Sequence, residues 1–217
     1  MKQGLFIAIE GIDGSGKTTQ VQELADWLPT SGLMPPGADL VVTREPGGTA
    51  LGQALRTLLL DPPAGPGLAL QTELLLYAAD RAQHVAERIA PALAAGHWVL
   101  SDRFSGSTVA YQGYGRGLSL EAIQQLDAFA TGGLRPDLTL WLDVPLKEAL
   151  QRLAQRNKDR IEAEGEEFLR SVRLGYMKQC PDPCWAWIDE DGGIDDVHFR
   201  CREEIKDFLA WRLTLRE

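Results

Sequence analysis

The sequence has few cysteines, no long apolar run and a deficit of basic residues. Only three of its 217 residues are cysteine, and an odd number without a secretory leader is typical of a reducing compartment. The apolar run at residues 5–9 is too short for a secretory leader or a membrane span. We therefore expect a cytoplasmic protein with no membrane partner.

Basic residues are outnumbered, with 22 Lys and Arg against 31 Asp and Glu, and the formal net charge is −9. A protein that coats nucleic acid needs a surplus of cations to neutralise phosphates, so no nucleic-acid partner is expected, although a local basic site remains compatible. The three thiols, Cys180, Cys184 and Cys201, match no common zinc spacing and are interpreted as structural.

Short apolar segments alternate with helical patterns along the chain. Strands are expected at residues 5–9, 40–43, 98–101, 138–142 and 185–188, with helices between them. A periodic stretch at about residues 72–95 places Leu75, Ala79 and Ile89 on one helix face. Alternating strands and helices predict an α/β fold in three layers, with an about five-stranded parallel sheet covered on both faces. The length predicts a single domain, residues 1–217.

One motif directly follows the first expected strand. Residues 11–18 match G-x-x-x-x-G-K-[ST] at every specified position, which is the pattern of a P-loop. Between a strand and a helix, such a loop surrounds phosphate oxygens with backbone N–H groups, Lys17 adds a positive charge, and Thr18 offers a hydroxyl to Mg²⁺. The alternative is a Gly-rich turn without a ligand. The predicted ATP-binding residues are Gly11, Ile12, Asp13, Gly14, Ser15, Gly16, Lys17, Thr18 and Thr19.

Charged residues also follow the second and third expected strands. Arg44 comes after residues 40–43, and Asp102 and Arg103 come after residues 98–101. Since the carboxyl ends of parallel strands meet at one edge, these side chains are expected beside the P-loop. Arginine suits a second phosphate, and Asp102 suits the Mg²⁺ region, partly through water. The alternative is a set of structural ion pairs at strand ends.

Several motifs occur together in one order. They are residues 11–19, 43–49 (TREPGGT), 77–84 (YAADRAQH), 102–104 (DRF), 107–113 (STVAYQG) and 159–162 (DRIE). In this combination, residues 4–178 resemble the thymidylate kinase family. The resemblance implies a P-loop kinase that transfers the γ-phosphoryl of ATP to dTMP, with Mg²⁺, giving dTDP and ADP for dTTP supply. It also implies a homodimer.

The resemblance assigns acceptor roles to matching positions. Arg44 and Arg103 would hold the acceptor phosphate, Tyr77 would stack on thymine, and Arg81 would reach its carbonyl. Without the resemblance, the favoured interpretation is that Tyr77 is a core residue and Arg81 the partner of a surface acid. Ser107 and Thr108 are also ordinary residues for the start of a helix. The predicted dTMP-binding residues are Asp13, Arg44, Pro46, Tyr77, Arg81, Arg103, Ser107, Thr108, Tyr111 and Gln112.

A basic segment at about residues 147–162 matches the position of the family's short lid. Such a run is otherwise typical of a solvated helix face. Because Gly14 follows Asp13 in the P-loop, the sequence resembles the bacterial type, in which lid arginines act on the transferred group. Asp13 alternatively forms a loop-stabilising Asx turn. The predicted catalytic residues are Asp13, Lys17, Arg103, Arg156 and Arg160.

Two other functions remain open on the sequence. A P-loop kinase for a different nucleoside monophosphate or a deoxynucleoside would share the first motif. A nonenzymatic P-loop nucleotide sensor would share it as well. The first alternative gives no reason for Tyr77, Arg81 and Tyr111 to occur together, and the second gives none for two acceptor-site arginines.

Overall fold

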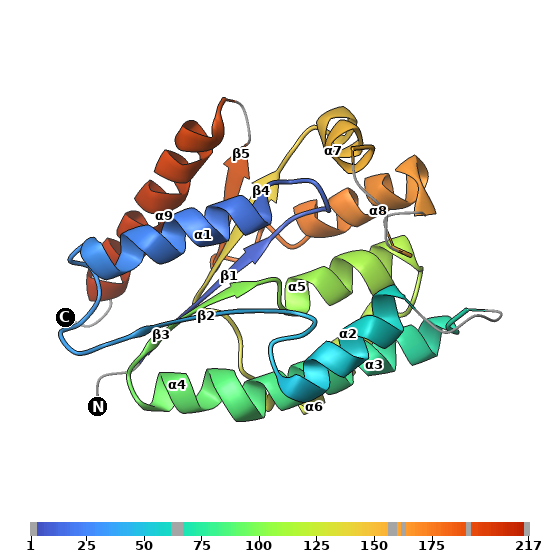
Figure 1. The fold of residues 1–217 in the computed structure, drawn as a ribbon, viewed down its shortest axis with the longest axis horizontal. Coiled ribbons are helices and arrows are strands. Elements are labelled where there is room, and N and C mark those ends of the chain that lie inside the picture. Colours follow the sequence, from blue (N-terminus) through green and yellow to red (C-terminus); the bar gives the residue numbers. More distant parts are fainter. Residues whose placement is uncertain (1–3, 62–66, 156–159, 162–163, 190–191, 215–217) are drawn as a thin grey trace.

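The computed structural model describes residues 4–61, 67–155, 160–161, 164–189 and 192–214. These residues form one five-stranded sheet in the order β2-β3-β1-β4-β5, and every neighbouring pair is parallel (Figure 1). The predicted sheet is confirmed. The strands are β1 (Leu5–Glu10), β2 (Leu40–Arg44), β3 (Trp98–Asp102), β4 (Leu138–Asp143) and β5 (Trp185–Asp189).

Helices cover both faces of the sheet and make the three layers (Figure 1). Two of them begin with a side-chain cap: Thr49 accepts from the Gly52 N–H at 2.9 Å, and Ser119 from the Ala122 N–H at 3.3 Å. The helices are α1 (Lys17–Trp27), η1 (Leu28–Thr30), α2 (Ala50–Leu60), α3 (Leu70–His84), η2 (Val85–Ile89), α4 (Ala90–Ala94), α5 (Ser105–Thr108), η3 (Val109–Gly115), α6 (Leu120–Thr131), α7 (Leu146–Leu153), α8 (Glu166–Met177) and α9 (Ile194–Thr214).

Strand β1 is buried along its whole length, which explains its continuous apolar run. Its alternate residues face opposite layers. Ile7 and Ile9 pack with Leu24 of α1 and Ile205 of α9, whereas Phe6 packs on the other face among residues of η2, α4 and β3. The β1 segment is therefore the centre of the core, and the loop that follows it has a fixed starting point.

Two features of the helices differ from the expected pattern. Leu75 and Ala79 are exposed, and the buried stripe of α3 contains Leu74, Ala78 and Arg81 instead. The predicted face was wrong for Leu75 and Ala79, because α3 buries charged groups that an apolar count omits, whereas Ile89 is buried as expected. In addition, α5 and η3 form a helical segment, residues 105–115, that the polar and Gly-rich sequence did not indicate.

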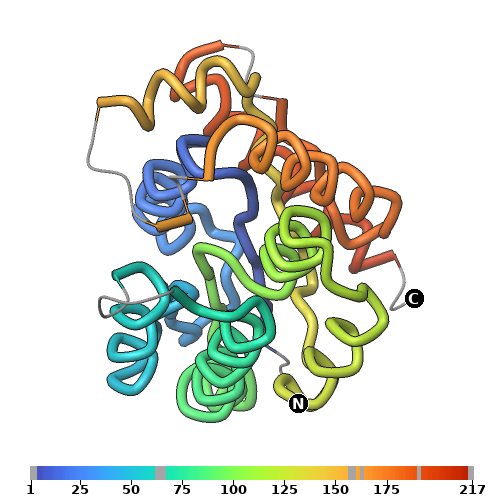
Figure 2. The backbone as a smooth tube through the Cα atoms, turned by 90° about the vertical axis from the view of Figure 1, so that its right-hand side faces the viewer, coloured from blue at the N-terminus to red at the C-terminus, as the bar shows by residue number. Residues whose placement is uncertain are grey.

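All five strands direct their carboxyl ends to one edge of the sheet. Figure 2 views this edge, where the start of α1 lies between α2 and α7. The P-loop, residues 11–18, connects β1 to α1 at this edge. No helix of the described residues has the length and apolar character needed to cross a membrane.

Candidate active site

The P-loop is shaped by glycines with positive φ. Gly16 has φ +81° at the start of α1, and Gly14 has φ +84°. A Cβ atom on Gly14 would lie 2.8 Å from the carbonyl oxygen of Ala149 in α7. No side chain fits there without a shift of α7, so the loop cannot carry a catalytic arginine at this position.

Lys17 and Thr18 follow these glycines on the first turn of α1. Lys17 is buried, and its Nζ donates to the carbonyl oxygen of Ile12 at 2.8 Å. Burial lowers the pKa of Lys17 to about 8, and the positive charge of Arg103 acts in the same direction. An anionic ligand at the loop would restore the full charge of Lys17.

Thr18 and Asp102 offer oxygens for a divalent cation. Thr18 Oγ1 donates to Asp102 Oδ2 at 3.4 Å, while Asp102 Oδ1 is buried and has no hydrogen-bond partner among the described residues. An orphaned carboxylate oxygen beside a hydroxyl suits Mg²⁺, which prefers oxygen ligands and retains several waters. The described part of the chain contains no group of three or more His, Cys, Asp or Glu side chains that could hold a metal ion.

A wide cavity of about 820 Å³ lies in front of the P-loop. Besides loop residues it contains cationic side chains from several elements, including Arg152 of α7, whose Nη1 donates to the Gly14 carbonyl at 2.9 Å. The wide cavity is lined by Asp13, Gly14, Gly16, Lys17, Thr18, Thr19, Val21, Val42, Thr43, Arg44, Glu45, Gly47, Gly48, Gln53, Arg56, Arg88, Asp102, Arg103 and Arg152.

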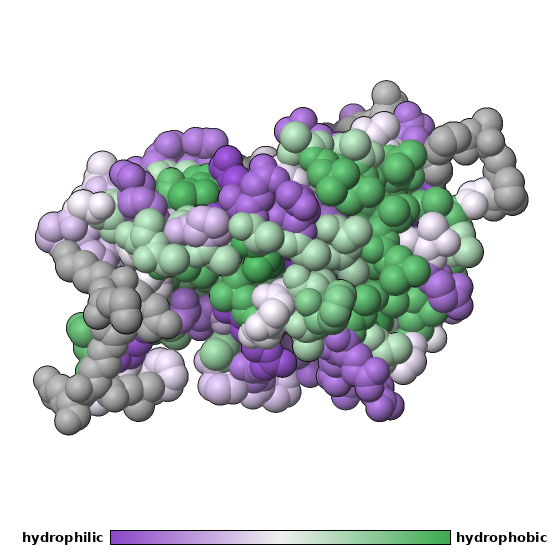
Figure 3. Space-filling view, turned by 90° about the horizontal axis from the view of Figure 1, so that it is seen from below, coloured by the Kyte–Doolittle hydropathy of each residue, from purple (hydrophilic) through white to green (hydrophobic). Residues whose placement is uncertain are grey.

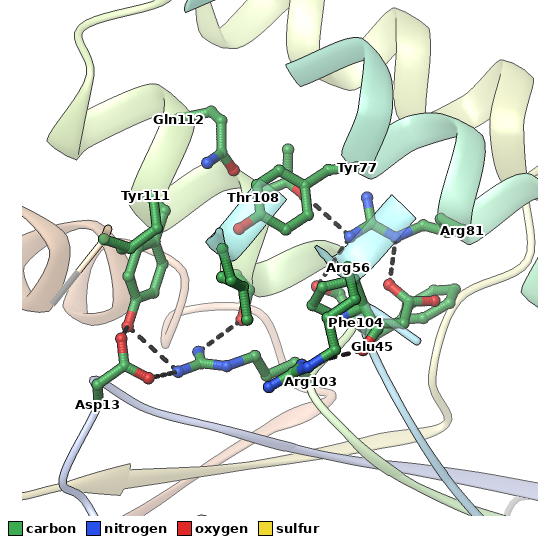
Figure 4. A pocket seen from close by; sticks show the side chains of 14 residues that line it. Asp13, Glu45, Arg56, Tyr77, Arg81, Arg103, Phe104, Thr108, Tyr111 and Gln112 are labelled. Carbon is green, nitrogen blue, oxygen red and sulfur yellow. Dashed lines mark hydrogen bonds and ion pairs between the residues drawn. The ribbon is translucent and has the colours of Figure 1, made fainter. Parts of the chain in front are cut away.

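A narrow cavity of about 80 Å³ adjoins it (Figure 4). Its walls combine rings and apolar side chains with charged and polar groups, so it suits a flat group with polar edges, whereas the wide cavity suits a polyphosphate. The narrow cavity is lined by Asp13, Glu45, Pro46, Arg56, Leu60, Tyr77, Arg81, Arg103, Phe104, Ser107, Thr108, Tyr111, Gln112 and Ile161.

Four charged residues, Asp13, Glu45, Arg56 and Arg103, line both cavities. Arg103 extends toward Asp13, and its Nη2 donates to Asp13 Oδ1 (Figure 4). Tyr111 also donates its hydroxyl to Asp13 Oδ2 at 2.7 Å, so Asp13 serves this cluster and the Asx-turn alternative is unnecessary. Burial opposes the charge of Asp13, but Arg103 and Lys17 outweigh it and lower its pKa to about 2.

Arg103 has an unusual backbone conformation. Among the described residues other than glycine, it alone has a positive φ, 72°. Such a conformation costs on the order of 1 kcal/mol for an L residue and persists where contacts fix it. The bonds of its side chain to Asp13, Gly11, Ser107, Tyr111 and Tyr176 supply these contacts.

The far end of the narrow cavity is fixed by Arg81 (Figure 4). Its guanidinium is buried, pairing with Glu45 Oε2 at 2.9 Å and Asp127 Oδ1 at 2.9 Å, and Nη2 donates to Thr108 Oγ1 at 2.8 Å. His84 in turn contacts Glu45 Oε1 at 2.8 Å. Arg81 is therefore a fixed donor at the cavity wall and not the partner of a surface acid.

The structure gathers most of the predicted site residues. Nine of the ten predicted acceptor residues line the narrow cavity, and Arg44 is the exception: it is exposed and lines only the wide cavity. Gly11, Ile12 and Ser15 of the P-loop are buried beneath the surface of the wide cavity. These placements bring the residues together but leave their chemical roles as predictions.

Of the two predicted lid arginines, the structure describes only Arg160, and it does not lie at the P-loop. Arg160 Nη2 pairs with Glu73 Oε2 at 2.7 Å, and its Nε donates to the Leu59 carbonyl at 2.9 Å, so Arg160 lines neither cavity. The buried carboxylate of Glu73 holds it on the α2–α3 side. Arg156 lies outside the described residues. Arg152, near the end of α7, lines the wall of the wide cavity.

Sequence reasoning missed several residues of the site. Arg56 and Glu45 line both cavities, and Phe104 lines the narrow one. A signal for Arg56 was present, since it is the only charged residue in the apolar segment 50–60. Glu45 and Phe104 stand inside motifs that were recognised. For Tyr176, distant in sequence and buried on α8, no local signal existed.

The fold and the two adjoining cavities define a phosphotransferase of the P-loop class with a second anionic acceptor. The family model described as thymidylate kinase matches residues 9–200. The chain belongs to the thymidylate kinase family.

Similar proteins cover nearly the whole chain. It is 57% identical to the thymidylate kinase of Synechococcus sp. (strain RCC307), over 97% of this chain and 100% of that protein. It is also 57% identical to that of Prochlorococcus marinus (strain MIT 9313), over 94% of each. The crystal structure of thymidylate kinase from Ehrlichia chaffeensis matches with a TM-score of 0.76 and 33% identity, covering 94% of this chain and 99% of the other.

Proposed function

We propose that this chain transfers the γ-phosphoryl group of ATP to dTMP, giving dTDP and ADP on the route to dTTP. The observation that carries the proposal is the junction of the two cavities at Arg56, Arg103 and Asp13. A nucleotide polyphosphate in the wide cavity and a flat base in the narrow one would direct their phosphates toward these arginines. Bidentate arginines are suited to hold the acceptor phosphate there.

The reaction needs little covalent participation by the protein. An oxygen of the acceptor phosphate forms a bond to the γ-phosphorus, and the bond from that phosphorus to the β–γ bridging oxygen breaks, so that ADP leaves with the electron pair. The acceptor oxygen is already anionic, and no general base is required. Lys17 and the arginines neutralise the charge on the transferred group and hold both substrates in line.

The narrow cavity would hold the thymine and deoxyribose of dTMP. Tyr77 offers a ring for stacking, Arg81 a fixed donor for a base carbonyl, and Pro46 an apolar wall for the methyl group. Burial raises the pKa of Tyr77 far above its ordinary value, so this ring stays neutral. Tyr111, bound to Asp13, would occupy the space that a ribose 2′-hydroxyl needs.

Thr18 and Asp102 would hold Mg²⁺, with ATP as co-substrate. When bound, the ion supplies positive charge to the phosphate oxygens. The orphaned Asp102 Oδ1 supports this assignment. Arg152 and Arg156 would add charge from a short lid at about residues 147–162 of a single domain, 1–217, and the cytoplasm would be the location.

The function is tested by ADP release from ATP and Mg²⁺ with dTMP, dUMP, TMP, AMP, CMP and GMP offered separately. We expect dTMP to be the best acceptor. The methyl group of thymine is worth about 1–3 kcal/mol in an apolar pocket, so dUMP should be about 10- to 200-fold poorer in kcat/KM. Preference for a ribonucleotide would support a different P-loop kinase, and no stimulation by any acceptor would support a nucleotide sensor.

A second copy of this chain would form a homodimer through α2, α3 and α6. Figure 3 shows apolar residues gathering on the face that carries these helices. Large exposed apolar side chains in this position are typical of an interface between protein chains. They are Leu51 and Leu58 on α2, Leu75 on α3, and Leu120 and Phe129 on α6.

Replacing Phe129, which is 87% exposed, with glutamate is expected to convert the dimer to a monomer, because the interface would bury an unpaired charge. Light scattering after gel filtration measures the mass. Phe199→Glu on α9 is a matched control that should keep the dimer mass. A wild-type monomer at micromolar concentration would contradict the proposed dimer.

A further inference from the structure

Glu10 is a carboxylate buried at the end of β1, and it lines neither the wide nor the narrow cavity. Its Oε1 accepts from the backbone N–H groups of Phe104 at 2.9 Å and Ser107 at 3.1 Å. Its Oε2 accepts from the hydroxyls of Ser107 at 2.6 Å and Tyr176 at 3.1 Å. Glu10 thus fixes the beginning of α5 and two hydroxyl groups together.

Both hydroxyl groups also contact Arg103. Arg103 Nη1 donates to Ser107 Oγ at 2.9 Å and to Tyr176 Oη at 3.0 Å. Each hydroxyl can accept from the guanidinium and donate its one hydrogen to Glu10. The two hydroxyl oxygens also lie 2.9 Å from each other, so the Ser107 and Tyr176 hydroxyls form one connected group between Glu10 and Arg103. The fully buried Tyr176 brings α8 into the same network.

The network holds a residue that is strained. Arg103 has φ 72°, and its side chain reaches Asp13 on one side and this pair of hydroxyls on the other. The guanidinium lies between two carboxylates, one in direct contact and one reached through hydroxyl groups. A small change on the buried side would therefore rotate or shift the guanidinium at the junction of the cavities.

We propose that Glu10 and Tyr176 are positioning residues that set the guanidinium of Arg103 for the acceptor phosphate. The inference deepens the proposed function, on which it rests. Neither residue lines the wide or the narrow cavity, so neither would contact a substrate bound there. Their effect passes through the two hydroxyl groups that link Glu10 to Arg103.

The two substitutions remove different hydrogen-bond donors and acceptors. Tyr176→Phe removes one acceptor of Arg103 and one donor of Glu10, and the ring remains packed against Trp141 and Trp185. In Glu10→Gln, the amide oxygen takes the place of Oε1, so both backbone donors keep their acceptor. The amide N–H₂ then faces two hydroxyls that already accept from Arg103, and at least one O–H loses its acceptor.

The experiment measures steady-state kinetics of Tyr176→Phe, Glu10→Gln and wild type, varying dTMP and ATP separately. We expect the KM for dTMP to rise about tenfold in both variants, the effect of losing one bond to a charged group, and the KM for ATP to change less than twofold. Tyr114→Phe is the matched control, because the Tyr114 hydroxyl makes no hydrogen bond among the described residues. It should leave both constants unchanged.

A double-variant comparison separates positioning from a general structural effect. In an Arg103→Lys background, where the fork geometry is already lost, adding Tyr176→Phe should change the KM for dTMP less than twofold. An undiminished tenfold effect in that background would overturn the inference. So would an equal rise in both KM values, or a lowered Tm with unchanged KM for dTMP.

Different results would refute the proposed function and the positioning role. Absence of dTMP phosphorylation by the wild-type chain would refute the function. If the wild type prefers another monophosphate, the same variants are measured with that acceptor, since Arg103 would face its phosphate as well. An unchanged acceptor KM in both variants of an active enzyme would refute only the positioning role.

Discussion

Arg103→Ala is expected to lower kcat/KM for dTMP by about 10³-fold, the effect of removing one positioned donor of a developing charge. Arg103 lines both cavities and brings a bidentate cation to the point where the two phosphates would meet. At 1.36 kcal/mol for each factor of ten, the loss corresponds to about 4 kcal/mol. Steady-state kinetics with dTMP as the varied substrate measures it.

ATP binding should survive in the same variant, because the P-loop contacts of Lys17 and the backbone remain. Isothermal titration calorimetry gives this affinity, and we expect a change of less than about threefold, within the range of a peripheral contact. Arg170→Ala, at an exposed arginine of α8, is the matched control and should retain full activity. Equal losses of ATP binding and acceptor use would instead assign Arg103 a structural role.

Lys17→Met should lower kcat by about 10³-fold, because the cation that neutralises the outer phosphates is lost while a side chain of similar length still fills its space. The substitution also removes the bond from Nζ to the Ile12 carbonyl at the base of the loop. Single-turnover measurement of ADP formation gives the chemical rate. Lys206→Met, at an exposed lysine of α9, is the control that should leave the rate unchanged.

The charge state of Lys17 provides an independent readout of the same prediction. Its pKa of about 8 means that the free side chain is half protonated near pH 8. ATP would raise this pKa, so binding at pH 8 should take up about half a proton, and the affinity should fall as the pH rises further. Calorimetry in buffers of different ionisation enthalpy measures the uptake. The same uptake in Lys17→Met would assign the proton to another group.

The strands and the P-loop were predictable because their signals are local. Residues 5–9 are apolar in succession and are followed at once by the loop motif, and both faces of β1 are buried as that pattern predicts. The carboxyl-edge rule then placed Asp102 and Arg103 beside the loop. Long-range contacts were not needed for these steps.

The arginines at the site were only partly predictable. Arg44 was chosen because it directly follows the expected strand at residues 40–43; it is the last residue of β2, and it lines the wide cavity alone. Arg56 reaches the junction because α2 folds back over the Gly-Gly turn: a Cβ atom on Gly47 would lie 3.1 Å from the Cδ of Arg56. Sequence position shows that Arg56 is the lone charge of its helix, but not where that helix packs.

The position of Arg160 also could not be predicted from local sequence. Arg160 was expected at the transferred phosphate, but its ion pair with the buried Glu73 and its hydrogen bond to the Leu59 carbonyl hold it against α2 and α3. Glu73 was unremarkable in the sequence. The Glu73 carboxylate is buried on α3, where it also accepts a hydrogen bond from Gln112 and pairs with Arg116. A buried carboxylate of this kind is a strong partner for a nearby guanidinium.

By itself, the sequence was enough to predict the α/β class, the P-loop, a second anionic site and the resemblance to one kinase family, because each rests on short local patterns whose order along the chain can be read directly. Only the tertiary structure decided which cations share the site. It also brings together Glu10 and Tyr176, which are 166 positions apart, on the buried side of Arg103. The reason is physical: direction and burial of a side chain depend on how distant elements pack, and local spacing does not contain that information.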